Sequence, residues 1–195
     1  MAVKIAITGD IGSGKSTVLG LFEKEGFLTL SADAIAHELM RDDQSVINAI
    51  REHFGSDVLS EETGVDRKAL AAKVFNDEED REILEEILHP RIRQHWVDFI
   101  KNHESDDVAV EIPLLFEKKL ENNFDSCVTV WARLDTKLER LRGRNLNEAA
   151  VKARLKAQLD QDTKSSRSKF VITNSGSLEF LHTQVRHCIA QLRNG

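Results

Sequence analysis

A glycine-rich segment near the amino terminus constrains this chain more than any other feature. Residues 9–16 match the spacing G-x-x-x-x-G-K-[ST] at every position. Residues 3–8, just before it, form a β-branched run typical of a strand buried on both faces. After it, Val18, Leu21 and Phe22 recur at helical spacing. The segment therefore lies between an expected strand and an expected helix, which is the setting that a phosphate-binding loop requires.

The residue types of this segment explain how it would bind phosphate. Glycines permit backbone angles that a Cβ would block, so successive N–H groups can point into one concavity at a helix N-terminus. Lys15 is expected to bridge the β- and γ-phosphates of a nucleotide, and the Ser16 hydroxyl to hold Mg²⁺. The loop alone does not distinguish a kinase from an ATPase or a GTPase. The residues expected to bind ATP here are Gly12, Ser13, Gly14, Lys15, Ser16 and Thr17.

Length and composition limit the class of protein. A chain of 195 residues suffices for one well-buried domain with small insertions. No apolar run approaches the roughly 20 residues that span a bilayer, and we expect neither a signal peptide nor a membrane partner. Cys127 and Cys188 are expected to be buried free thiols in a reducing cytoplasm.

The distribution of charge is more informative than its total. The net charge of −6 argues against a general nucleic-acid binder. Residues 133–169, however, carry 11 Lys and Arg against 5 Asp and Glu, a local charge of +6. This basic segment suggests one bound polyanion, although a solvated pair of charged helices would look the same.

Two carboxylates lie at the ends of expected strands. Asp33 follows residues 28–30, and Glu111 lies in the strand expected over residues 108–113. In open α/β sheets this edge is where ligands bind. Asp33 fits a catalytic carboxylate or a helix N-cap. Glu111 fits either of two interpretations. In one it faces the site, where it would order water around Mg²⁺ or bond substrate. In the other it is a surface residue at the strand's exit.

Apolar spacing and turn residues predict the remaining elements. We expect strands at residues 127–131 and 169–173, a loop over residues 55–65, and helices over residues 46–54, 67–75, 77–100 and 178–192. Pro90 is expected to break or kink the third of these helices at His89. In the last helix we expect Leu178, Leu181, Val185, Ile189 and Leu192 on the buried face.

A basic helical hairpin is expected after the fourth strand. Arg140 and Arg144 are four residues apart and share one helical face. A second helix is expected from Asn147 to about residue 160. A closing lid over a polyphosphate requires such a hairpin, and arginine suits it because its planar fork binds phosphate bidentately.

Taken together, segments along nearly the whole chain resemble the dephospho-coenzyme A kinases. The loop is shared by many nucleotide-binding proteins, whereas Ile-Pro-Leu-Leu-Phe-Glu and Leu-His-Pro are specific in combination. The matching segments are residues 8–17, 32–39, 66–70, 88–90, 112–117, Arg140 with Arg144, Arg154 with Ala157 and Gln158, and 174–176.

The resemblance implies ATP-dependent phosphorylation of the ribose 3′-hydroxyl of dephospho-coenzyme A, the last step of coenzyme A synthesis. It also implies a three-layer α/β/α P-loop fold, similar to the nucleoside monophosphate kinases, on a five-stranded parallel sheet. By this resemblance one domain comprises a core, a helical substrate-binding insertion and a lid. The core takes about residues 1–43, 105–134 and 163–195, the insertion about 44–104, and the lid about 135–162.

The resemblance also implies roles for single residues. Asp33 matches the carboxylate beside the acceptor hydroxyl, Arg140 a lid arginine that reaches the phosphates, and Asn174 the adenine-side turn. The expected catalytic residues are Lys15, Asp33 and Arg140. Arg144 and Asn174 are expected to contribute to the ATP site. The expected acceptor-side residues are Thr8, Asp33, His89, Glu111, Leu114, Leu115 and Phe116.

Three residues depart from the family pattern. Asp10 replaces the usual second glycine of the loop, and we expect its side chain to point outward. Ser31 replaces the first aspartate of Asp-Ala-Asp, which leaves Asp33 as the carboxylate there. Lys137 stands where glutamine is common and adds charge to the expected lid.

Two other interpretations remain open. One is a P-loop kinase for another small metabolite, such as a sugar acid, shikimate or a nucleoside. The other is a nucleotide-dependent switch or binding module without catalysis. Asp33, Glu111 and the arginine-bearing hairpin favour a kinase, because a switch does not require them. Nothing in the sequence indicates an oligomeric state.

Overall fold

The computed structural model describes residues 2–60, 64–74, 77–142, 155 and 158–194. It divides into two compact units. One comprises Met1–Ser31 with Asn102–Gly195, and the other comprises Ala32–Lys101. Each unit is described separately. None of the helices in the described residues has the length and apolar character needed to span a membrane.

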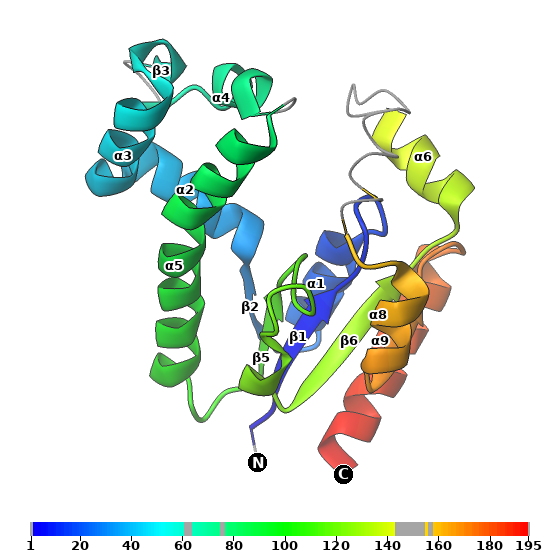
Figure 1. The fold of residues 1–195 in the computed structure, drawn as a ribbon. Coiled ribbons are helices and arrows are strands. Elements are labelled where there is room, and N and C mark those ends of the chain that lie inside the picture. The colour runs from blue at the N-terminus through cyan, green and yellow to red at the C-terminus, as the bar shows by residue number, and fades with distance from the viewer. Residues whose placement is uncertain (1, 61–63, 75–76, 143–154, 156–157, 195) are drawn as a thin grey trace. The chain divides into compact units, whose positions relative to one another are not determined.

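A five-stranded parallel sheet forms the centre of the first unit (Figure 1). The strand order is β2-β5-β1-β6-β7, so β1 lies in the middle and pairs with β5 on one side and β6 on the other. The five expected strands are confirmed, with small differences at their ends. They are β1 Lys4–Thr8, β2 Leu28–Ser31, β5 Val108–Glu111, β6 Ser126–Trp131 and β7 Phe170–Thr173.

Helices lie on both faces of this sheet (Figure 1). Apolar side chains of β1 and β6 share one core with α1, Lys15–Lys24, and α9, Leu178–Asn194. On the opposite face of β6, Thr129 Oγ1 lies 3.2 Å from the carbonyl oxygen of Lys164 in α8, Gln161–Arg167. Because side chains alternate across a strand, these contacts define two covered faces. The three-layer α/β/α fold is confirmed.

Helix α9 buries the expected stripe except at its first residue. Leu181, Val185, Ile189 and Leu192 are buried, but Leu178 is 60% exposed. Leu178 begins the helix, ahead of the residues that face the sheet. The placement of Leu178 on the buried face was therefore wrong.

The second unit is mainly helical. The side chain of Asp43 caps α3 by accepting hydrogen bonds from the N–H groups of Ser45 and Val46. The elements of the unit are α2 Ala32–Asp42, α3 Gln44–Phe54, the 3₁₀ turn η1 Ser56–Val58, β3 Leu59–Ser60, β4 Gly64–Val65, α4 Arg67–Val74 and α5 Glu78–Asn102. The region expected to be only a loop, residues 55–65, thus contains a 3₁₀ turn and a short antiparallel strand pair.

Helix α5 runs through Pro90 without a break (Figure 1). Proline removes one backbone donor and disfavours a helical residue before it, which is why a break at His89 was expected. Leu88 and Trp96, on either side of the proline, are buried. Their packing offsets a local cost of about 3 kcal/mol. Of the two expected outcomes, a break was therefore wrong, and a kink at Pro90 stays a prediction.

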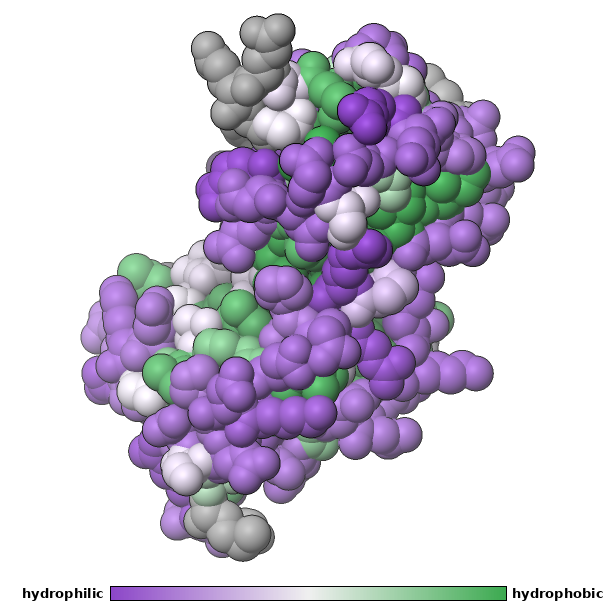
Figure 2. All heavy atoms as spheres, turned by 90° about the vertical axis from the view of Figure 1, so that its left-hand side faces the viewer, coloured by the Kyte–Doolittle hydropathy of each residue, from purple (hydrophilic) through white to green (hydrophobic). Residues whose placement is uncertain are grey.

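The exterior is rich in charge. Figure 2 shows a face covered mostly by hydrophilic residues, with hydrophobic residues in small patches between them. Charged residues make up 31% of the chain. Large hydrophobic side chains that are exposed in the described residues are Leu28, Leu134, Val171, Leu178 and Phe180.

Candidate functional site

The glycine-rich loop connects β1 to α1 in the first unit. Gly9, Gly12 and Gly14 have φ angles of +143°, +79° and +89°, which residues with a Cβ rarely adopt. A Cβ added at Gly14 would lie 2.1 Å from Nδ2 of Asn174, and one added at Gly9 would lie 2.4 Å from the Val130 carbonyl oxygen. The loop therefore requires glycine for both its backbone angles and its close neighbours.

Helix α1 begins directly at the loop, so its first N–H groups and its dipole favour an anion there. The Lys15 ammonium donates to the Asp10 carbonyl oxygen at 3.2 Å, which holds it at the loop. Ser16 and Thr17, in the first turn, are exposed. Ser13 is fully buried, and its N–H donates to the Asp10 carbonyl oxygen at 3.2 Å.

Arg140 and Asn174 both contact the loop from distant parts of the chain. Arg140 lies in α6, Leu134–Arg142, and its Nη1 donates to the carbonyl oxygens of Gly12 at 3.3 Å and Ser13 at 3.1 Å. Asn174 Nδ2 donates to the Ser13 carbonyl oxygen at 2.8 Å. Arg140 Nη2 also donates to the backbone and side-chain oxygens of Asn174, at 2.9 and 3.2 Å. The structure thus brings together the loop, the arginine and the asparagine that the sequence analysis assigned to the ATP site.

The Asp10 side chain points inward and is buried, so the expectation that it points outward was wrong. Its Oδ2 accepts a hydrogen bond from Lys137 Nζ at 2.8 Å, and its Oδ1 lies 3.9 Å from Lys164 Nζ. A buried carboxylate is costly unless it is paired, and these two cations pair it. Asp10 and Lys137, which the sequence analysis singled out separately, are therefore in direct contact.

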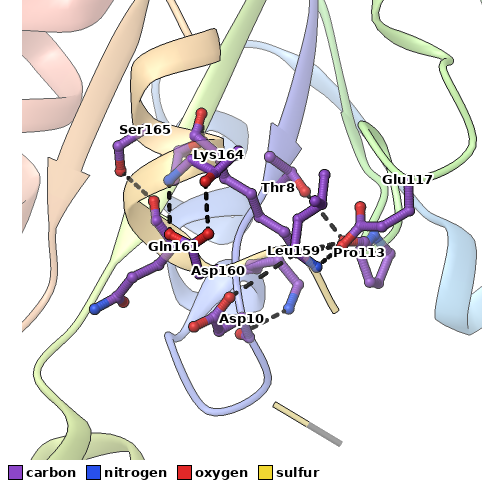
Figure 3. Close-up of polar contacts among 12 residues, drawn as sticks. Thr8, Asp10, Pro113, Glu117, Leu159, Asp160, Gln161, Lys164 and Ser165 are labelled. Atoms are coloured by element: carbon purple, nitrogen blue, oxygen red, sulfur yellow. Dashed lines mark hydrogen bonds and ion pairs between the residues drawn. The ribbon is translucent and has the colours of Figure 1, made fainter. Parts of the chain in front are cut away.

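Lys164 connects this carboxylate to the segment that follows β5 (Figure 3). It is fully buried, lies 2.9 Å from Glu117 Oε1 and donates to the Pro113 carbonyl oxygen at 3.4 Å. Thr8 donates to the same carbonyl oxygen at 3.2 Å. The sequence analysis missed Lys164, because nothing in the pattern of α8 distinguishes a buried lysine from an exposed one.

The predicted acceptor-side residues of β5 and its exit are mostly interior. Glu111 is 2% exposed and lies in register with Ile7 of β1, so the surface alternative for it was wrong. Leu115 and Phe116 are also buried, and Leu114 is partly exposed. These residues contribute to the first unit's interior.

Asp33 and His89 belong to the second unit. Asp33 is exposed in the first turn of α2, which begins at Ala32, so it is neither the N-cap nor a strand residue. Burial and the charge of Arg67 lower the pKa of His37, and the Asp33 carboxylate partly opposes them. His89, in α5, is partly exposed, with its Nδ1 3.8 Å from Glu85 Oε2. Arg144, Arg154 and most of the expected second lid helix lie outside the described residues, and residues 158–160, where that helix was expected to end, are not helical.

Ser16 is the described residue that fits the role of Mg²⁺ ligand. The described residues include no group of three or more His, Cys, Asp and Glu residues able to hold a metal ion. Magnesium in nucleotide sites commonly takes one or two protein groups, water and substrate phosphates. The exposed Ser16 hydroxyl beside the loop fits that arrangement.

The two cysteines play no part in this site. Both are buried free thiols, and burial raises the pKa of Cys127 to about 11 and that of Cys188 to about 12. Because the thiolate is the reactive form, neither is a nucleophile at neutral pH.

A parallel sheet whose central strand leads through a glycine-rich amide loop into a helix defines a P-loop nucleotide-binding protein. Comparison of structures agrees with this class. A shikimate kinase from Bacteroides thetaiotaomicron superposes with a TM-score of 0.53 over 98% of each chain, at 16% identity, which shows the fold alone.

The chain belongs to the dephospho-CoA kinase family, since that family's model matches residues 3–179. A dephospho-CoA kinase of Corynebacterium glutamicum is 36% identical over 194 residues, covering 97% of this chain and 100% of that protein. The solved dephospho-CoA kinase from Campylobacter jejuni has a TM-score of 0.68 at 30% identity, covering 98% of this chain and 97% of the other.

Proposed function

We propose that this protein transfers the γ-phosphoryl group of ATP to the ribose 3′-hydroxyl of dephospho-coenzyme A, which yields coenzyme A and ADP. The supporting observation is the joining of Lys15, Arg140 and the glycine loop at one site in a member of this family. In the reaction the 3′-oxygen forms a bond to the γ-phosphorus, and the bond from that phosphorus to the β,γ-bridging oxygen breaks. The proton of the hydroxyl passes to a base.

The nucleotide side of this proposal relies on preorganised positive charge. The first N–H groups of α1 and the Lys15 ammonium would hold the β- and γ-phosphates. Arg140 already lies at the loop, where its guanidinium would stabilise charge on the transferred group. Arg144 would add to it. Asn174 would shape the adenine side through its contact with the loop.

Mg²⁺, held by Ser16 and the phosphates, would neutralise charge that develops on the phosphoryl oxygens. The protein's own contribution at this point is an exposed hydroxyl in the first turn of α1. No described carboxylate cluster competes for the ion.

Asp33 is the proposed base. Its carboxylate is exposed in the first turn of α2, so other side chains do not cover it. We propose that Thr8, His89, Glu111 and residues 114–116 shape the acceptor side. Within the single kinase domain, residues 44–104 would serve as the substrate-binding insertion and residues 135–162 as the lid. A cytoplasmic location suits the two free thiols.

Mass spectrometry of dephospho-coenzyme A incubated with ATP, Mg²⁺ and the protein tests this function. The expected product is heavier by one phosphate, and an acceptor without the 3′-hydroxyl should give none. A panel of acceptors can be compared by the ADP that each releases. A preference for shikimate, a sugar acid or a nucleoside would contradict dephospho-coenzyme A as the acceptor. ATP binding without transfer to any acceptor would favour a switch.

Two variants test the residue roles. Lys15→Ala and Asp33→Asn are each expected to lower turnover by about 100-fold or more. Asp42→Asn, an exposed carboxylate on the same helix as Asp33, is the matched control and should leave turnover unchanged. Turnover within about threefold of wild type in a folded Asp33→Asn variant would exclude Asp33 as the base.

A further inference from the structure

The phosphate-binding loop carries a negative charge of its own. Asp10 is 5% exposed, and its Oδ1 has no hydrogen-bond partner in the described part of the chain. Its Oδ2 accepts from Lys137 at 2.8 Å, whereas Lys164 is 3.9 Å from Oδ1. Lys137 is therefore the closer of the two cations that neutralise Asp10. A phosphate-binding site needs that neutralisation, because an unpaired carboxylate in the loop would repel the anion.

The Lys137 side chain is held in its contact with Asp10. It is 3% exposed, and its ammonium also donates to Gln161 Oε1 of α8 at 3.1 Å. The Lys164 ammonium in turn lies 2.9 Å from Glu117 Oε1, and the Leu159 N–H donates to the same oxygen at 3.0 Å. Figure 3 shows Lys164 reaching from α8 toward Asp10 and Glu117. Two lysines and two carboxylates, of which all but the partly exposed Glu117 are buried, thus form a cluster of zero net formal charge.

Helix α6 therefore contacts the loop through two cations. Lys137 and Arg140 are three residues apart, which places them on one face of the helix. Lys137 binds the Asp10 side chain, and Arg140 binds the carbonyl oxygens of Gly12 and Ser13. Loss of the Lys137–Asp10 contact would therefore remove one of the two cationic contacts that hold α6 at the loop.

Asp10 also connects this pair to the catalytic lysine. Its carbonyl oxygen accepts from Lys15 Nζ at 3.2 Å and from the Ser13 N–H at 3.2 Å. The side chain and the backbone of one residue thus join α6 to Lys15. A shift of the Asp10 side chain would be transmitted to both cations of the site.

We propose that Asp10 and Lys137 are a reciprocal positioning pair that holds Arg140 and Lys15 in register for phosphoryl transfer. The inference rests on the proposed function for its kinetic test. Neither residue contacts phosphate in this proposal. Asp10 accepts the hydrogen bond from Lys137, and Lys137 neutralises the Asp10 carboxylate and fixes the position of α6. The proposal predicts that either charge, when the other has been removed, impairs phosphoryl transfer.

A double-mutant cycle tests this reciprocity. Lys137→Gln and Asp10→Asn are each expected to lower kcat/KM for ATP by about 10-fold or more, with KM for dephospho-coenzyme A unchanged. The double variant, in which an amide faces an amide, should regain activity to within about threefold of wild type. Lys24→Gln, at an exposed lysine of α1, is the matched control and should match wild type.

Three outcomes would overturn the pair. Losses that multiply to about 100-fold in the double variant would show that the residues act independently. Loss in Lys137→Gln and the double variant, but none in Asp10→Asn, would show that Lys137 binds phosphate directly. Lower melting temperatures with wild-type kinetics at low temperature would show a purely structural role.

Titration with a fluorescent ATP analogue separates this inference from the proposed function. If wild type phosphorylates no dephospho-coenzyme A, the proposed function fails, but the same four proteins still report on the loop. Recovery of analogue affinity in the double variant is then the expected result, and equal weakening in the single and double variants would overturn the pair. Should Lys137→Gln not fold, Asp10→Asn alone keeps the inference falsifiable: it is expected to weaken binding of the analogue by about 10-fold, and wild-type affinity in this variant would overturn the pair.

Discussion

Lys164→Met is expected to lower the free energy of unfolding by about 3 kcal/mol. Lys164 is fully buried, and its ammonium lies 2.9 Å from Glu117 Oε1 and 3.9 Å from Asp10 Oδ1. Removing one partner of a buried ion pair costs about 3–5 kcal/mol, because the other charge remains buried. The lower end applies because Asp10 keeps Lys137, and Glu117 keeps the Leu159 N–H.

Urea unfolding followed by circular dichroism measures this loss, and Trp131 fluorescence gives a local probe when all variants carry Trp96→Phe, which removes the second tryptophan. The Trp131 indole N–H donates to Asp162 of α8 at 3.3 Å, so it reports on the helix that carries Lys164. A loss of about 3 kcal/mol corresponds to a fall in Tm of about 6–12 °C for a protein of this size. Lys24→Met, at an exposed lysine, removes the same charge and should change the unfolding free energy by less than about 0.5 kcal/mol.

A second substitution checks the cause. In Lys164→Met/Glu117→Gln the uncompensated charge is gone, while the amide oxygen can still accept from the Leu159 N–H. At least half of the lost stability should return. A cost below about 1 kcal/mol for Lys164→Met, or a double variant no more stable than the single one, would refute the reasoning.

Single features of the structure give three further predictions. Gly14→Ala should weaken ATP binding by about 10-fold or more in a nucleotide titration, because its Cβ would lie 2.1 Å from Asn174 Nδ2 at a φ of +89°. Burial alone would raise the pKa of Asp107, but hydrogen bonds from the Arg193 side chain and the Val3 N–H outweigh it and lower this pKa. Asp107 therefore contributes its full stabilisation above the ordinary aspartate pKa of about 4 and loses it as pH falls through the lowered pKa of the folded state, so Asp107→Asn should cost about 1 kcal/mol in urea unfolding at pH 7 and progressively less as pH falls below about 4. Burial raises the pKa of the two cysteine thiols to about 11 and about 12, so a thiol reagent at pH 8 should label neither in the folded protein and both after denaturation.

Much of the first unit was predictable because its signals are local or periodic. The strand, glycine loop and helix at residues 3–24 are recognisable from spacing, and the structure has all three. Arg140 was found through helical spacing together with the family resemblance, and it lies at the loop. The roles of Asp33 and His89 remain predictions, since each is described within the second unit alone.

Two of the errors share one cause, which is that packing overrode a local rule. Pro90 should end a helix by its own chemistry, yet α5 continues between buried Leu88 and Trp96. Asp10 should favour solvent, yet it is buried because Lys137 and Lys164 reach it. The sequence analysis missed Lys164 for the same reason, since the burial of its side chain depends on partners elsewhere in the chain.

Sequence alone determined the class of fold and the place of the nucleotide loop, because glycine's backbone freedom and the spacing of apolar residues act over a few positions. Tertiary structure decided which charges are buried and what they pair with. Lys137 meets Asp10 across 127 residues of chain, and Asn174 meets Ser13 across 161. A buried charge is stable only where folding delivers an opposite one, so its environment is a property of the assembled layers.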